Sequence, residues 1–172
     1  MTSTELSADL VDWAALARYG YVRREDWFRF STEGGGTSFY IRPSEMDHGW
    51  FTVTESERRE PENLIFSAAS LDIVEKYFWA DFGFVIRMSR RLPRLVFSLD
   101  ADDIAEGYSM TAAGQELLEL RDPAAKAIAK ASDELTGKSL LAELSHVIGY
   151  SAEELHASYL DAAAHPIFPR TR

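Results

Sequence analysis

The sequence predicts an α+β protein in which an antiparallel β-sheet of about four to six strands packs against several α-helices. Between residues 21 and 69, short runs of aromatic and β-branched residues alternate with clusters of turn residues, a pattern typical of strands joined by hairpins. Segments 6–19 and 70–91 flank this region and repeat apolar residues at the helical spacing. With 172 residues, of which 46% are hydrophobic, the chain is long enough to enclose a core, and we expect one domain spanning 1–172.

The first helix is predicted over residues 6–19. Leu10 and Trp13 are three residues apart, which places them on one helical face. Ser7 can cap the start of this helix by accepting a backbone hydrogen bond, and Gly20 supplies a stop. We expect Trp13 to anchor the helix to the core.

The sheet is predicted over residues 21–69. Its aromatic and β-branched runs lie at 27–30, 38–41, 50–53 and 64–66. Between them stand the glycine triplet 34–36, the turn 47–49 after Pro43, and the polar segment 58–61. Hairpin connections of this length favour antiparallel pairing over βαβ units.

The core helix is predicted over residues 70–91. Its apolar stripe consists of Leu71, Val74, Phe78, Phe82, Val85 and Ile86. Ser70 caps its start, and Arg87 stands near its end, where a cation complements the helix dipole. Gly83 costs about 1 kcal/mol relative to alanine inside a helix, so we expect it to mark a kink or a close contact.

The C-terminal part, residues 100–165, is predicted to be mostly helical, after one more strand at 95–97. Its expected pieces are a short helix over 100–106, a strand or helical turn over 115–120, a solvated helix or mobile excursion over 123–136, and an amphipathic helix over 139–150. Ser151 and Glu154 form a capping box that opens a last helix.

Composition and charge restrict the partners. The formal net charge of −10 at pH 7 disfavours nucleic acid and anionic membranes and favours a basic protein surface. Because the chain has no cysteine, it forms neither disulfides nor thiolate metal sites. The N-terminus shows no secretory signal, and no apolar run reaches membrane-spanning length, so we expect a cytoplasmic protein.

No residue pattern predicts catalysis, a cofactor or a bound metal. The glycine triplet 34–36 precedes a strand instead of a helix, so a hairpin turn explains it better than a phosphate-binding loop. The four histidines show no metal-ligand spacing. The aspartates between 100 and 103 suit the start of a helix. The residues alone therefore give no support to a catalytic function.

Several segments, taken together and in order, resemble one family. They are the end of the first helix at 18–20, the segments 64–78, 82–87 and 103–108, and residues 144–146 with the last helix 151–160. This arrangement resembles the immunity proteins that neutralise toxins of the tuberculosis necrotizing toxin class, which are NAD⁺ glycohydrolases. The resemblance implies an α+β fold without a cofactor or enzymatic activity. It also implies a 1:1 complex with a cognate toxin, in which a loop of the immunity protein blocks the NAD⁺ pocket.

Three polar loops are candidates for this blocking role. We favour the segment between two predicted strands that consists of Glu55, Ser56, Glu57, Arg58, Arg59, Glu60, Pro61 and Glu62, because it is polar, exposed and flanked by rigid elements. Within it we expect Arg58 or Arg59 to contribute to binding. The rival loops, whose glycines allow close backbone approach, are Gly34, Gly35 and Gly36, and Asp47, His48 and Gly49. Each loop is also explained as an ordinary hairpin turn.

Two other functions fit the sequence. The protein could inhibit another toxin class, such as a nuclease, by presenting acidic residues of 100–106 and 116–122 in place of phosphates. It could also bind a small molecule on the aromatic residues of the sheet, for which a packed core is the simpler explanation.

Overall fold

The computed structural model describes residues 5–58, 60–95, 103–165 and 167. They form an eight-stranded antiparallel sheet in the order β1-β2-β3-β4-β5-β8-β7-β6. The strands are β1 (Tyr19–Arg23), β2 (Phe28–Thr32), β3 (Thr37–Pro43), β4 (Phe51–Glu57), β5 (Asn63–Ala68), β6 (Ser109–Ala112), β7 (Leu117–Arg121) and β8 (Ala127–Ser132). The helices are α1 (Ala8–Leu16), α2 (Leu71–Ser89), α3 (Leu135–Val147) and α4 (Ala152–Leu160). The predicted α+β class is confirmed, with more strands than expected.

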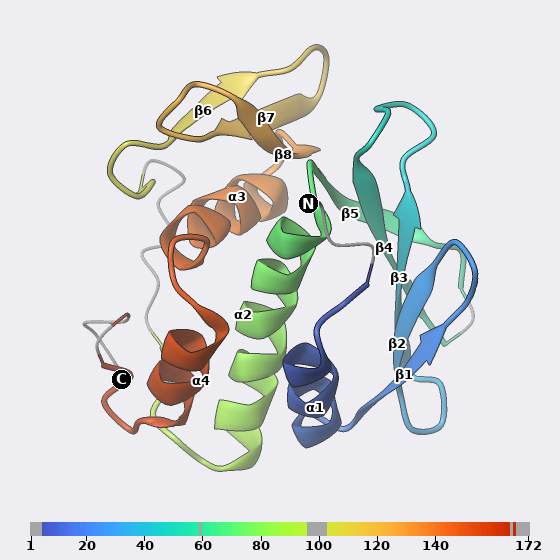
Figure 1. Cartoon of the computed structure of the whole chain (residues 1–172), viewed down its shortest axis with the longest axis vertical. Helices are drawn as coiled ribbons and strands as arrows, with labels where there is room; N and C mark the ends of the chain where they lie inside the picture. The colour runs from blue at the N-terminus through green and yellow to red at the C-terminus, as the bar shows by residue number, and fades with distance from the viewer. Residues whose placement is uncertain (1–4, 59, 96–102, 166, 168–172) are drawn as a thin grey trace.

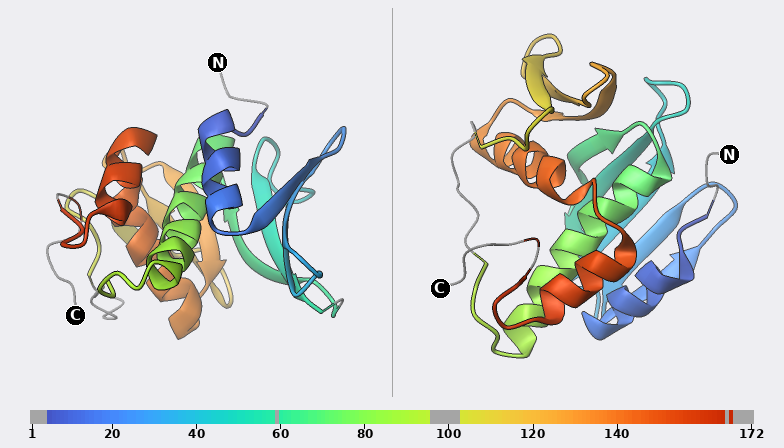
Figure 2. Two further views of the ribbon diagram at one scale, coloured as in Figure 1. Left: turned by 90° about the horizontal axis from the view of Figure 1, so that it is seen from below. Right: turned by 60° about the vertical axis from the view of Figure 1, so that its left-hand side comes forward.

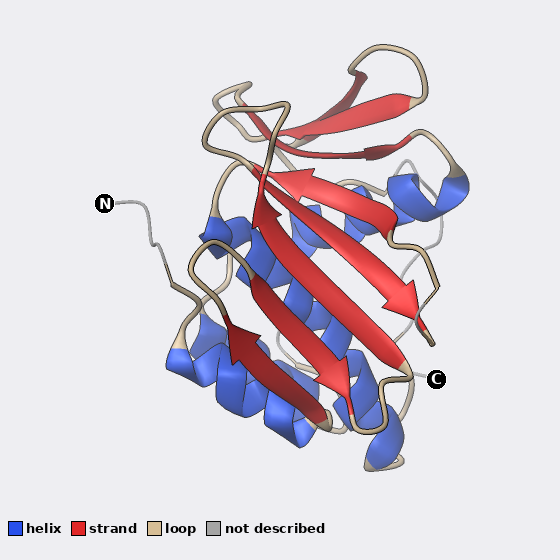
Figure 3. Cartoon of the chain, turned by 90° about the vertical axis from the view of Figure 1, so that its right-hand side faces the viewer, coloured by secondary structure: helices blue, strands red, loops and turns tan. Residues whose placement is uncertain are grey.

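The helices lie behind the sheet in the view of Figure 3, and no described helix lies in front of it. Figure 1 shows α2 at the centre of the molecule, and Figure 2 shows α4, α2 and α1 side by side in one layer. Of the described helices, none combines the length and apolar character needed to cross a bilayer.

The first five strands follow one another as hairpins. The turns and aromatic runs predict β2 to β5, whereas β1 was not predicted. In the register, Phe30 faces Phe39 and Ile41 faces Val53. These side chains are at most 4% exposed, because alternate residues of each strand point toward the helical layer. This face of the sheet forms the larger part of the core.

The prediction of a mostly helical C-terminal part is wrong before α3. Residues 123–136 were expected to form a solvated helix or an excursion, yet β8 pairs with β5 in the interior of the sheet through Ala68 and Ala129. Ala129 and Ala131 are buried, and Lys130 between them is on the opposite face. Alanine favours helices in isolation, but pairing with distant strands overrides this preference.

The strands β6 and β7 also lie in the part that was predicted to be mostly helical. Segment 115–120, for which a strand or a helical turn was expected, contains most of β7. The short helix expected over 100–106 does not form at 103–106, and residues 96–102 lie outside the described part of the chain. The same gap covers most of the strand expected at 95–97, of which Leu95 is a buried bridge residue.

Helix α1 is shorter than the predicted span 6–19. The predicted cap, Ser7, and the predicted anchor, Trp13, are confirmed. The hydroxyl of Ser7 accepts a hydrogen bond from the Leu10 N–H at 3.3 Å. Trp13 is 1% exposed, and its ring N–H donates to the carbonyl of Trp79 on α2 at 3.1 Å. The helix ends at the C-cap residue 17, before the left-handed Arg18 (φ 65°), and Gly20 belongs to β1.

The core helix α2 packs its aromatic residues onto the sheet. Phe78 and Phe82 contact Phe30, with ring centroids 5.1 Å away in each case. Gly83 marks a close contact, as expected, because a Cβ atom there would lie 2.5 Å from the ring of Tyr159 on α4. The predicted capping box opens α4, with both of its hydrogen bonds present.

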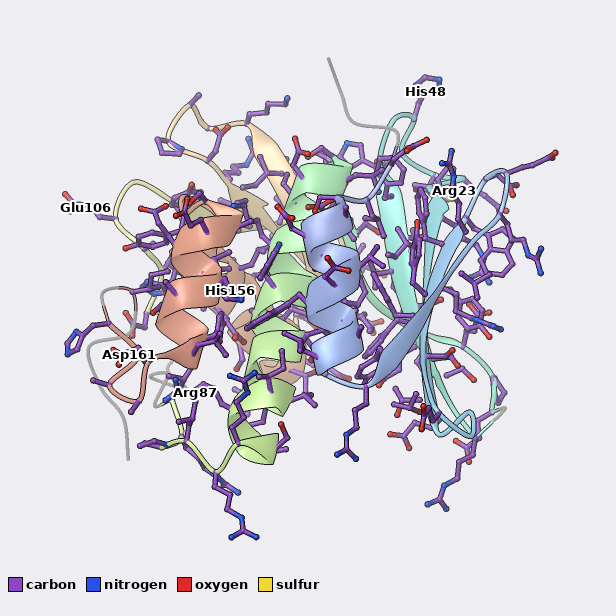
Figure 4. All side chains as sticks on the ribbon, turned by 60° about the horizontal axis from the view of Figure 1, so that its bottom comes forward. Arg23, His48, Arg87, Glu106, His156 and Asp161 are labelled. Carbon is purple, nitrogen blue, oxygen red and sulfur yellow. The ribbon has the colours of Figure 1, made fainter. Side chains whose placement is uncertain are left out.

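Arg87 joins the ends of α2 and α4 and is only 2% exposed. Its guanidinium donates to the carbonyls of Tyr159 at 2.9 Å, Asp161 at 2.6 Å and Ala162 at 3.1 Å. It also donates to the carbonyl of Pro93 at 2.7 and 3.1 Å. Figure 4 shows Arg87 beside Asp161 at the end of α4. The arginine thus caps α4 from a neighbouring helix.

Candidate functional site

The β4–β5 hairpin contains the loop that the sequence favours for blocking the toxin. Residues 55–57 end β4, so the turn begins at Arg58. Arg58 has a φ of 45°, a left-handed conformation that is uncommon outside glycine. The Glu60 N–H donates to the Glu57 carbonyl at 2.7 Å, and the Ser56 hydroxyl donates to the Glu60 carbonyl at 2.6 Å. The turn is therefore held by its own hydrogen bonds.

Hydrogen bonds to Glu62 stabilise the base of this hairpin. Arg42 on β3 donates to both oxygens of Glu62, at 2.5 and 2.9 Å, and the Thr54 hydroxyl donates to the same carboxylate at 2.5 Å. The hydrogen bond from Arg42 lowers the pKa of Glu62. Arg59 lies outside the described residues. The exposed tip consists of Arg58, Glu60 and Pro61.

The structure brings together two of the three candidate loops. The backbone N–H of Arg58 donates to the carbonyl of Gly36 at 2.7 Å, which joins the β4–β5 hairpin to the β2–β3 turn. Gly34 and Gly35 have φ values of 81° and 71°, which favour glycine. A shallow depression of about 290 Å³ lies between the two turns. Its lining, called the hairpin edge below, consists of Gly36, Thr37, Glu57, Arg58 and Glu60.

The third candidate loop lies at the opposite end of β3. Seven residues of strand separate it from the β2–β3 turn, a span of roughly 20 Å. Asp47 accepts hydrogen bonds from Lys130 on β8 at 2.9 and 3.0 Å. The same ammonium lies 4.6 Å from the ring centroid of Trp50. His48 and Gly49 are exposed. This loop is tied to β8 and does not share the hairpin edge.

A cavity between α2 and α3 is the feature that the sequence analysis missed. It has a volume of about 260 Å³ and is called the α2–α3 cavity below. Its lining consists of Tyr77, Ala80, Asp81 and Phe84 from α2, and Leu140, Glu143, Leu144 and Val147 from α3. Two carboxyl groups therefore share a mainly apolar hollow.

The two acids of this cavity have raised pKa values. Burial raises the pKa of Asp81 to about 6, and the neighbouring charge of Glu55 on β4 adds to this increase. Burial likewise raises the pKa of Glu143 to about 7, with a further contribution from Asp81. Desolvation, with the charges of Asp81 and Glu55, raises the pKa of Tyr19 to about 12. A recognisable signal was available, since Asp81 and Glu143 each interrupt an apolar helical stripe.

Two of the four histidines, His156 and His146, take structural positions. His156 packs against Trp13 with ring centroids 5.0 Å apart, and a ring nitrogen of His146 lies 3.0 Å from the carbonyl of Asp103. Within the described residues, no group of three or more His, Cys, Asp or Glu side chains is arranged to hold a metal ion. Asp103 is exposed in irregular structure and opens no helix, while residues 100–102 are outside the described part.

Comparison with known proteins identifies the family of this chain. A model of the family described as immunity protein 61 matches residues 13–167. This chain belongs to the immunity protein 61 family. The immunity protein is therefore a toxin inhibitor, or antitoxin, and its partner is a cognate toxin. The resemblance seen in the sequence is confirmed.

Its relatives match along almost their whole length. Two proteins, each 30% identical to this immunity protein over 173 residues, cover 95% of this chain and 93% of their own. They are described as "Immunity factor for TNT", from Mycobacterium tuberculosis, and "Immunity factor for TNT homolog", from Mycobacterium bovis. The solved structure of Rv3902c from M. tuberculosis is similar, with a TM-score of 0.83 and 27% identity, over 98% of this chain and 97% of that one.

Proposed function

We propose that this immunity protein neutralises an NAD⁺ glycohydrolase of the tuberculosis necrotizing toxin class by inserting the β4–β5 hairpin into its NAD⁺ pocket. The observation that carries the proposal is the match, across nearly the whole chain, to immunity factors for TNT. An inhibitor of this kind needs no catalytic group or cofactor of its own. The hairpin and the cofactor would exclude each other from one cavity. We also infer that the protein acts in the cytoplasm, because such a toxin consumes the NAD⁺ held there.

The hairpin edge has the properties of a blocking element. The hydrogen bond from Ser56 to Glu60 and the bidentate pair of Arg42 with Glu62 hold the hairpin before it meets a partner. A preorganised loop loses little conformational entropy on binding. Because the β2–β3 turn is bonded to it, both turns would approach the toxin together. The exposed cation Arg58 stands at the tip, where it can meet carbonyl or acidic groups of a pocket.

The complex should be stoichiometric and tight. A single blocking hairpin implies one immunity protein for each toxin. Full neutralisation of an enzyme that is lethal in few copies requires affinity on the order of 1 nM, or about −12 kcal/mol. An interface of standard size, roughly 1,600 Å² in total, would extend beyond the hairpin to the surrounding surface.

Binding assays on matched variants test the hairpin. We expect Arg58→Glu to weaken binding to the toxin's catalytic domain by roughly 2–4 kcal/mol, as loss of a central contact does. His48→Ala, in the loop at the other end of β3, is the matched control and should bind like the wild type. Inhibition should also be competitive with NAD⁺. Normal binding by Arg58→Glu together with loss of binding by His48→Ala would move the blocking role to residues 47–49.

The alternative of an acidic phosphate mimic has less support. Glu119, in the middle of its second acidic segment, is 8% exposed and pairs with Arg121 on the same strand. A carboxylate that is buried and neutralised in this way does not present charge to a basic surface. The remaining acids of this segment, Glu116 and Asp122, lie just outside the two ends of β7, so they do not form a continuous acidic row along the strand.

A further inference from the structure

The α2–α3 cavity is not explained by the fold alone. Asp81 and Glu143 are partly buried in the wall of the cavity, yet neither has a hydrogen bond or an ion pair with another described residue. Partly buried carboxylates without a partner carry a desolvation cost, and proteins usually pair or solvate such groups. A cost of this kind is retained where a ligand supplies the missing partner.

We propose that the α2–α3 cavity receives a basic side chain of the toxin, an arginine in preference to a lysine, whose charged group reaches Asp81 and Glu143. This inference rests on the proposed function, because it takes the bound protein to be the toxin. It adds a second contact, formed by helices, to the one made by the hairpin edge.

The size and chemistry of the cavity favour this occupant. Its volume of about 260 Å³ falls below the roughly 300–1,000 Å³ typical of small-molecule sites, so it suits one side chain better than a cofactor. Its wall is apolar except for Tyr77 and the two carboxyls, and an arginine or lysine likewise joins an apolar stem to a charged end. Arginine is preferred because its guanidinium is more weakly hydrated and can bind two carboxylates through its fork.

The titratable groups that face Asp81 and Glu143 are mostly acids and phenols. From β4, Glu55 acts on Asp81, and the phenols that face the same acids are Tyr19 on β1, Tyr77 on α2 and Tyr159 on α4. Arg87 acts on Tyr159, but its guanidinium is committed to backbone carbonyls. Among the described residues, no cation contributes to the raised pKa values of Asp81 and Glu143.

The mouth of the cavity also has the character of a docking surface. Phe84, in its wall, is 39% exposed, and Met88, one helical turn further along α2, is 50% exposed. Aromatic and methionine side chains are enriched at protein interfaces. Neighbouring Glu55 belongs to the strand that leads into the hairpin edge, so one partner can contact both features.

Binding of a cation should release protons. In the free protein the pKa values are about 6 for Asp81 and about 7 for Glu143, and a guanidinium stabilises the charged forms. If both groups are ionised in the complex, affinity should be about twentyfold lower at pH 6 than at pH 8.

The decisive experiment measures the dissociation constant of the toxin's catalytic domain at pH 6, 7 and 8 for three proteins. We expect Glu143→Gln, which keeps the shape but removes the charge, to fold normally, to bind about tenfold or more weakly at pH 8, and to lose most of the pH dependence. Glu153→Gln makes the same change at an exposed position of α4 and should behave like the wild type. Equal affinities and equal pH dependence for all three proteins would overturn the proposal.

A second arm separates the cavity from the identity of the toxin. Propylguanidinium is titrated into ¹³C-labelled protein while the carboxyl resonance of Glu143 reports its pKa, which should fall by about one unit or more. Should the wild type fail to bind the toxin, the proposed function is refuted and this arm decides the cavity alone. An unchanged pKa of Glu143 would then overturn the inference, and an equal response to butylammonium would overturn the preference for arginine.

Discussion

Replacing Arg87 with methionine tests whether one side chain holds the ends of two helices. Methionine keeps a long apolar stem, but the change removes five hydrogen bonds, made to the carbonyls of Pro93, Tyr159, Asp161 and Ala162. Three of these carbonyls, those of Tyr159, Asp161 and Ala162, lie at the C-terminal end of α4, where the last carbonyls of a helix lack intrahelical partners. We therefore expect Arg87→Met to destabilise the fold and to loosen α4 first.

The size of the expected loss in stability follows from the burial of the Arg87 side chain. A hydrogen bond to a charged donor contributes roughly 1.5–3 kcal/mol. Residues 161 and 162 are exposed, so water can replace part of what is lost and the contributions do not simply add. We expect a loss of roughly 3–5 kcal/mol in the free energy of unfolding. For a domain of this size, the melting temperature should fall by roughly 6–20 °C.

Urea unfolding at pH 7, followed by circular dichroism and tryptophan fluorescence, measures this loss. Arg87→Lys should be intermediate, because an ammonium has three donors and no planar fork. Arg90→Met, at an exposed position of the same helix end, is the control and should change stability by less than about 0.5 kcal/mol. A loss below about 1 kcal/mol for Arg87→Met, or equal losses for Arg87→Met and Arg90→Met, would refute this reasoning.

Three further changes have expected outcomes. Gly83→Ala should destabilise by roughly 1–3 kcal/mol despite better helix propensity, because its Cβ would lie 2.5 Å from the ring of Tyr159; a rise in the urea midpoint would contradict this. Ser151→Ala removes the capping box of α4 and should cost about 1 kcal/mol, measured in the same way. Folding raises the pKa values of Asp81 and Glu143 to about 6 and 7, so protonation of these groups stabilises the folded state. This stabilisation is complete below about pH 4 and is lost as the pH rises through 6–7. Relative to the wild type, Glu143→Gln should therefore gain roughly 1–3 kcal/mol between pH 5 and pH 8, and a pH-independent difference would exclude the buried charge as its cause.

Local signals predicted most elements between residues 6 and 91, and the start of α4, well. Ser7, Ser70 and the Ser151 capping box all act as caps in the structure, because capping depends on residues a few positions apart. Strands β2 to β5 were likewise delimited by their own turns, whereas β1 was not predicted. Strand β8 was missed, since its alanines and Lys130 favour helix locally and its partner β5 lies about sixty residues away in the sequence.

The site was predictable only in pieces. The polar loops 34–36 and 55–62 are visible in the sequence, but only strand register places their turns side by side through Arg58 and Gly36. The α2–α3 cavity depends on two helices whose packing no local pattern specifies. An acid within each apolar stripe, Asp81 and Glu143, was the available signal, and it became meaningful only when α2 and α3 were in contact.

The most direct test of the account is NAD⁺ hydrolysis by the cognate toxin, titrated with this protein. The proposed neutralisation predicts that hydrolysis falls linearly and ends near one equivalent of the immunity protein, and that the two proteins co-elute as a complex on gel filtration. Unchanged hydrolysis in the presence of a large excess of the immunity protein would contradict it.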